Sequence, residues 1–82
     1  MLPAKEITSA ASLFVSEQMN LPSEGINAVT PLKELGMDSF RIIELVLFLE
    51  RRTGLSFPDH AYTPENLKSV DSIVACFLKL KS

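Results

Sequence analysis

The sequence predicts an all-α fold: a four-helix bundle with three long helices, one short helix, and a long loop between helices one and two. Three observations support this. Apolar residues recur at helical spacing in three separate segments, no segment alternates strongly enough to form a β-strand, and proline or glycine stands near the expected helix ends. The 82 residues contain no internal repeat and no linker, so we expect one domain spanning residues 1–82.

The first helix is expected to begin near Pro3, because the first turn of a helix does not need the N–H that proline lacks. It should end at Asn20-Leu21-Pro22, since the residue before a proline avoids the helical region. The apolar face of this helix consists of Ile7, Ala11, Phe14, Val15 and Met19.

A long loop follows, from about Asn20 to Asp38, and loops of this length usually have a purpose. Thr30 and Pro31 are typical of an N-cap followed by proline at the first helical position. They predict a short turn through Leu32 and Leu35 that Gly36 closes. Four apolar residues are expected to hold the loop against the bundle: Ile26, Val29, Leu32 and Leu35.

The second helix should run from Ser39 to Thr53, with Asp38 as its N-cap and Gly54 as its C-terminal stop. Its inner face has the spacing i, i+3, i+4, i+7 and consists of Ile42, Leu45, Val46 and Leu49. A second apolar stripe, on a neighbouring face, consists of Phe40, Ile43 and Leu47, with Phe48 beside it. A helix this apolar either lies deep in a core or shows part of its surface to a partner.

Two further helices are expected in the last third of the chain. Thr63 and Pro64 predict a short third helix over about 63–66, again from the cap-then-proline pattern. Ser69 is the expected cap of the last helix, and the lysines at the end of that helix favour the negative pole of its dipole. Its apolar stripe consists of Val70, Ile73, Val74 and Phe77.

The composition of the chain narrows the range of functions that it can have. The hydrophobic fraction is 46%, the formal net charge is −2, and there is one cysteine and one histidine. We therefore expect no disulfide framework, no metal site and no nucleic-acid footprint. With neither an apolar run of about 20 residues nor a signal peptide at the start, a cytoplasmic monomer is expected. A chain this small can hardly enclose a whole enzyme site, which favours a carrier, adaptor or binding module over an enzyme.

The segment 35–40, Leu-Gly-Met-Asp-Ser-Phe, opens the apolar second helix and resembles the phosphopantetheine attachment motif of acyl carrier proteins. That motif usually reads Gly-x-Asp-Ser followed by Leu or Ile. Taken alone, Asp-Ser before a helix is weak, since Asp38 can simply be an N-cap. The resemblance extends to further segments along nearly the whole chain: residues 31–35, 51–54, 57–58 and 62–67.

The resemblance implies that Ser39 carries a 4′-phosphopantetheine arm, attached from coenzyme A by a separate phosphopantetheinyl transferase. Cargo would then be held as a thioester on the thiol of the arm. A phosphodiester on Ser39 would lie at a helix N-terminus, which favours an anion. Asp38 and Gly36 complete the expected attachment site, with Gly36 allowing a tight turn.

The resemblance also implies that the second helix is the main docking face. The expected partner contacts are Phe40, Arg41, Ile43, Glu44, Leu47, Glu50 and Arg51. Alternatively, Ile43 and Leu47 are covered by the long loop. Fatty-acid carriers typically present several acidic residues here, whereas this helix contains Arg41, Arg51 and Arg52. A specialised carrier with acyl, polyketide or aminoacyl cargo is expected, served by a loading ligase and by downstream synthases or transferases.

Two alternatives stay open: an aminoacyl or peptidyl carrier protein, and a helical adaptor that never receives the arm. A hydrolase built on Ser39 and His60 is disfavoured, because a loop histidine is usually solvated. Cargo could lie among residues of the second and last helices, or these could form an ordinary core: Leu45, Val46, Leu49, Ile73 and Phe77.

Overall fold

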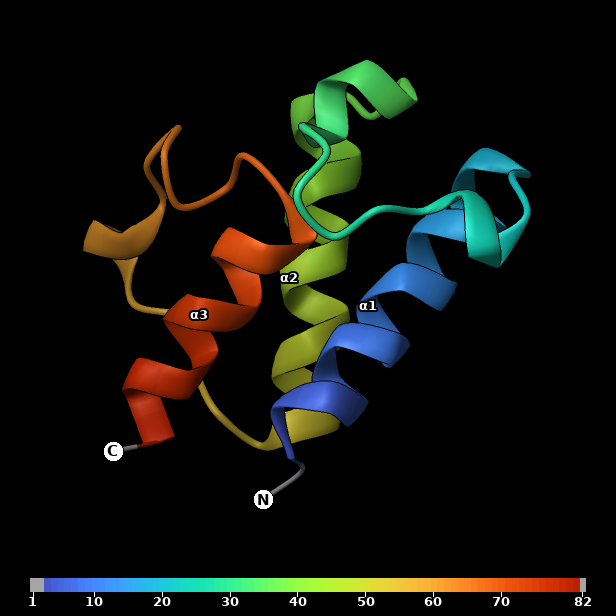
Figure 1. The fold of residues 1–82 in the computed structure, drawn as a ribbon. Helices are drawn as coiled ribbons and strands as arrows, with labels where there is room; N and C mark the ends of the chain where they lie inside the picture. The colour runs from blue at the N-terminus through green and yellow to red at the C-terminus, as the bar shows by residue number, and fades with distance from the viewer. Residues whose placement is uncertain (1–2, 82) are drawn as a thin grey trace.

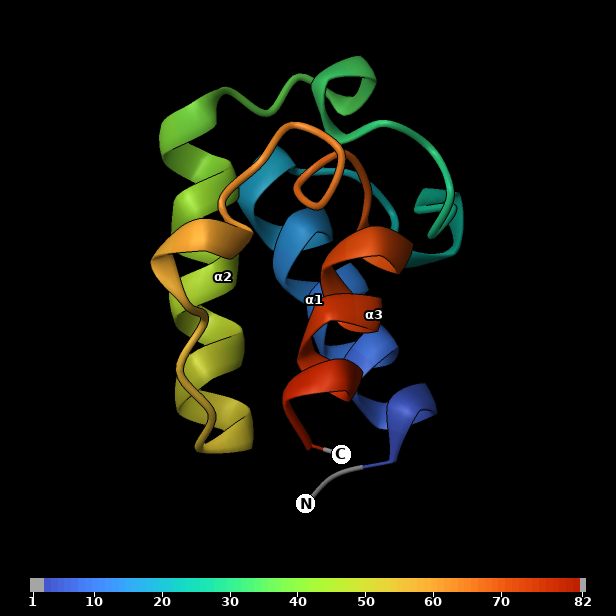
Figure 2. The ribbon, with the colours of Figure 1, turned by 90° about the vertical axis from the view of Figure 1, so that its left-hand side faces the viewer.

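Three α-helices run through the protein, whose structure is a computed structural model that describes residues 3–81. They are α1 (Ala4–Met19), α2 (Ser39–Thr53) and α3 (Val70–Lys81), with 3-10 turns η1 (Ser23–Gly25), η2 (Leu32–Leu35) and η3 (Asp59–Ala61) between them. Helix α1 runs in the direction opposite to α2 and α3, as Figures 1 and 2 show, and it packs against both. The all-α prediction is confirmed for the described residues. The predicted domain 1–82 includes residues 1, 2 and 82, which lie outside them.

The predicted count of four helices is not confirmed, because the short third helix is a turn over residues 64–67. The Thr63 hydroxyl does cap this turn, accepting a hydrogen bond from the Asn66 N–H at 3.2 Å. The Asn66 side chain then donates back to the Ala61 carbonyl, and the Lys68 carbonyl accepts from the Leu32 N–H across the molecule. The segment makes one helix-like backbone bond, from the Leu67 N–H to the Thr63 carbonyl at 3.0 Å, and the chain then bends at residues 68–69.

The long loop differs from the prediction in two places. Pro31, not Thr30, stands at the start of η2, and it makes no side-chain cap. The Thr30 N–H instead donates to the Asn27 carbonyl. Val29 is 66% exposed, so it does not hold the loop against the bundle; Leu32 is fully buried and does. The predicted ends of α1 and η2 are confirmed. Helix α1 ends at Asn20 and η2 ends at Gly36, and both residues have left-handed backbone angles.

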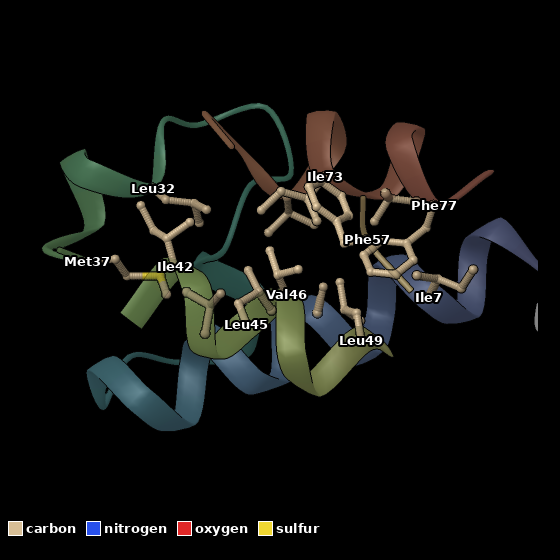
Figure 3. Close-up of a cluster of buried hydrophobic side chains, with 14 of the residues drawn as sticks. Ile7, Leu32, Met37, Ile42, Leu45, Val46, Leu49, Phe57, Ile73 and Phe77 are labelled. Atoms are coloured by element: carbon tan, nitrogen blue, oxygen red, sulfur yellow. The ribbon is translucent and has the colours of Figure 1, made fainter. Parts of the chain in front are cut away.

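The core lies where the helices face one another (Figure 3), and the predicted inner face of α2 is buried there. The predicted stripe of α3 is also buried, and the Ser69 hydroxyl accepts from the Ser72 N–H at the helix start. Phe57 links α2 to α3: its ring centroid lies 5.3 Å from that of Phe77, and its N–H donates to the Glu50 carboxylate. The five residues considered as a cargo lining are wholly buried in this core cluster: Leu45, Val46, Leu49, Ile73 and Phe77.

Candidate functional site

The chain enters α2 through a tight turn that only glycine fits well. Gly36 has a φ of 94°, which L side chains rarely adopt, and a Cβ there would stand 3.0 Å from the Met19 Cε. The Met37 N–H then donates to the Leu32 carbonyl at 3.2 Å, and the Met37 side chain is 2% exposed. The predicted role of Gly36 as a turn residue agrees with this geometry. Buried Met37 and Leu32 fix the position of the residues that follow.

Asp38 is the N-cap of α2, as the sequence predicts. Its Oδ1 accepts a hydrogen bond from the Arg41 N–H at 2.9 Å. Ser39 is the first helical residue and is exposed. Within residues 3–81 the structure gives its hydroxyl no hydrogen-bond partner. The hydroxyl is therefore accessible to solvent, at a helix end whose dipole favours an anion.

We expect Asp38→Ala to lower the free energy of unfolding by about 1 kcal/mol, because the Arg41 N–H loses its acceptor. Chemical denaturation monitored by circular dichroism measures the loss. Asp38→Asn is the matched control, since asparagine caps as well as aspartate. Equal destabilisation by both substitutions would contradict a capping role.

A groove of about 510 Å³ opens beside Ser39, between α2, η2 and the segment that leads into α3. The α2 residues in its wall are Ser39, Ile42 and Ile43, and Ile43 is half-buried. The other lining residues are Pro31, Lys33, Tyr62, Thr63, Pro64, Leu67 and Lys68. The sequence did not single out Lys33, Tyr62 or Lys68, because only the folded chain brings them together.

The residues of α2 that are expected to contact partners differ in how exposed they are and in whether other segments hold them. Phe40 and Leu47 lie on the outer edge of α2 with exposures of 70% and 43%, and Arg51 is exposed as well. Leu47 is therefore not covered by the long loop. Arg41 and Glu50 are hydrogen-bonded within the protein: Arg41 Nη1 donates to Gln18 Oε1 at 2.7 Å, and the Glu50 carboxylate accepts from the Phe57 N–H. Glu44 is half-buried between Phe40 and Leu47 along the helix.

The histidine and the cysteine of the chain do not line the groove beside Ser39. His60 is exposed in η3 and does not line the groove. Cys76 is half-buried, and burial raises the pKa of its thiol, an effect that Lys79 partly offsets. Among the described residues no three histidine, cysteine or acidic side chains are grouped as metal ligands would be. In the same residues no helix is both long and apolar enough to span a bilayer.

Comparison with known proteins decides the family. The profile of the phosphopantetheine attachment site matches residues 4–77, which is most of the chain. The chain belongs to this family of acyl carrier proteins. It is 34% identical to the probable acyl carrier protein PigG of Serratia sp., over all of this chain and 91% of that protein. It is 40% identical over 52 residues to an acyl carrier protein of Saccharopolyspora erythraea, covering 62% of this chain and 55% of that protein.

The chain is thus a carrier protein, and the resemblance noted in the sequence is confirmed. In this carrier the attachment motif stands at one end of α2 and the exposed apolar edge continues along the same helix. Sequence reasoning missed Gln18, which holds the Arg41 guanidinium, and Met37, which anchors the motif in the core. Only Met37 left a signal in the sequence, as an apolar residue between glycine and aspartate.

Proposed function

We propose that 4′-phosphopantetheine is attached covalently to Ser39 of this carrier protein. The observation that carries the proposal is the exposed Ser39 hydroxyl, which has no partner among residues 3–81, at the N-terminus of α2 and in the family's motif. In the reaction, a transferase directs the Ser39 oxygen to the pyrophosphate of coenzyme A. A P–O bond forms to serine, the pyrophosphate bond breaks, and adenosine 3′,5′-bisphosphate leaves. The serine proton passes to the transferase or to water.

The cargo in this proposal is an acyl or related group, held as a thioester and presented to the enzymes of a dedicated pathway. The basic residues of α2 support a dedicated pathway, since enzymes that recognise an acidic helix would meet Arg51 and Arg52 instead. An aminoacyl or peptidyl cargo is the second candidate. The expected partners of the carrier protein are a loading ligase and downstream synthases or transferases. A cytoplasmic monomer stays the predicted state.

The test is transfer of the arm to the purified chain. We expect incubation with a phosphopantetheinyl transferase, Mg²⁺ and coenzyme A to raise the intact mass by one arm per chain. Peptide mapping should place the arm on Ser39. A sample without transferase is the control. If transferases of broad specificity add nothing, the unmodified adaptor becomes the better description.

A further inference from the structure

A second groove, of about 380 Å³, runs between α1 and α2 and shares no residue with the groove beside Ser39. The α1 residues in its wall recur every three or four positions from Glu6 to Glu17. Helix α2 contributes Phe48 and Arg52 to the wall. Neither α3 nor any of the 3-10 turns lines this groove, so it is a feature of the α1–α2 pair alone.

The apolar part of the α1–α2 groove contains a stacked aromatic pair, Phe14 and Phe48. Their ring centroids lie 4.7 Å apart with 26° between the ring planes, and both side chains are half-buried. Leu13, next to Phe14 in the wall, is 52% exposed. A helix with apolar residues outside its core-facing stripe commonly packs against a further element there. Within residues 3–81 no third element lines the groove.

The position of the groove indicates the shape of its occupant. Helices α1 and α2 are antiparallel neighbours (Figures 1 and 2), and α3 packs against α1 without entering the groove. The groove between two packed helices is complementary to a ridge of side chains on a third helix. A helix recognised in this way lays one apolar stripe into the groove, with its anchors at helical spacing. The occupant that fits is therefore an amphipathic helix.

The charges around the groove favour a basic occupant. Glu6 and Glu17 are both exposed and are eleven residues apart, so they lie on one side of α1 about three turns, or about 16 Å, from each other. Arg52 is the base in the α2 wall. Within residues 3–81 none of the three makes an ion pair. Two acids against one base attract a basic partner, and they disfavour a second copy of this chain, whose net charge is −2.

We infer that the α1–α2 groove binds an amphipathic helix of a partner protein. An apolar stripe of that helix covers the aromatic pair and Leu13, and basic residues about three turns apart meet Glu6 and Glu17. Neither Ser39 nor the outer edge of α2 lines this groove, so a partner held here leaves the attachment site uncovered. The inference goes beyond the proposed function, because it does not require that Ser39 carries the arm.

The test uses two synthetic amphipathic helical peptides that share one leucine stripe. Lysines flank the stripe at two positions eleven residues apart in one peptide, and glutamates take these positions in the other. Each peptide is titrated into the 15N-labelled full chain and followed by NMR. We expect the lysine peptide to bind at least about threefold more tightly at low salt, with shifts along residues 6–17 and 48–52. The difference should shrink as salt screens the charges.

Several outcomes of the titration would overturn the inference. Equal affinities, tighter binding of the glutamate peptide, or binding of neither peptide would each do so. Shifts centred on the outer edge of α2, or on the groove beside Ser39, would place the peptide elsewhere. Shifts that depend on protein concentration without peptide would identify a second copy of the chain as the occupant, which also contradicts the inference.

Matched charge variants separate the groove from the net charge of the chain. The double variant Glu6→Lys, Glu17→Lys should reverse the preference between the peptides. The control, Glu34→Lys with Glu65→Lys, changes the net charge equally at two exposed acids outside the groove, and it should still prefer the lysine peptide. Loss of the preference in both double variants would assign it to net charge and overturn the inference.

A second pair of variants tests the apolar contact. Leu13→Ala should weaken binding of the lysine peptide severalfold, whereas Leu47→Ala, at an exposed leucine on the outer edge of α2, should not. The opposite result would move the site to that outer edge. Arm transfer is measured by intact mass on the same samples, so a failed docking test leaves the carrier proposal standing if Ser39 is still modified.

Discussion

A Ser39→Ala variant is expected to accept no arm from a transferase and coenzyme A, while the unchanged chain is modified to completion. The substitution removes the oxygen that would bond to phosphorus, and no change elsewhere can restore it. The fold should persist, because Ser39 is exposed and its hydroxyl makes no bond within residues 3–81. Substitutions at such surface positions change stability by about 0.5 kcal/mol or less. Intact mass and circular dichroism measure the two properties on one sample.

The control for this variant is Ser9→Ala, which removes the hydroxyl of another exposed helical serine. It should be modified like the unchanged chain. Arm transfer to the Ser39→Ala variant would place the attachment site at a different residue. Loss of the helical signal, by contrast, would show that the hydroxyl has a structural role that its exposure does not suggest.

A Phe77→Ala variant is expected to lose about 3–5 kcal/mol of stability, the usual loss for truncating a buried phenylalanine. Phe77 is fully buried, and its ring packs against Phe57, so the truncation leaves a cavity at the joint between α3 and α2. Domains of this size are stable by only about 5–15 kcal/mol. At about 4–8 °C for each kcal/mol, the melting temperature should fall by more than about 12 °C.

Phe40→Ala is the matched control, because it makes the same substitution at a phenylalanine that is 70% exposed. Its melting temperature should stay within a few degrees of the unchanged chain. Thermal unfolding followed by circular dichroism compares the two variants directly. Similar losses in both would mean that Phe77 is not part of the stabilising core, or that Phe40 packs in solution.

The prediction of α2 succeeded because its signals are local. The capping aspartate, the apolar spacing and the terminal glycine all lie within or beside the helix they define. Gly36 was also predictable, since a turn that needs a positive φ favours glycine. The expected short helix after Thr63 failed for the opposite reason. The local cap on Thr63 is present, but the chain bends at residues 68–69, where the Lys68 carbonyl accepts a hydrogen bond from the Leu32 N–H.

By itself, then, the sequence determined the class of fold, the helix that presents Ser39 and the family motif around that residue. Only the tertiary structure decided which polar side chains of α2 are held by residues of other segments. Arg41 finds Gln18, 23 residues earlier in the chain, and Glu50 finds the backbone of Phe57. The groove beside Ser39 is likewise assembled from three separate segments. No periodicity encodes such pairings, because they depend on how the segments pack rather than on the conformation of any one of them.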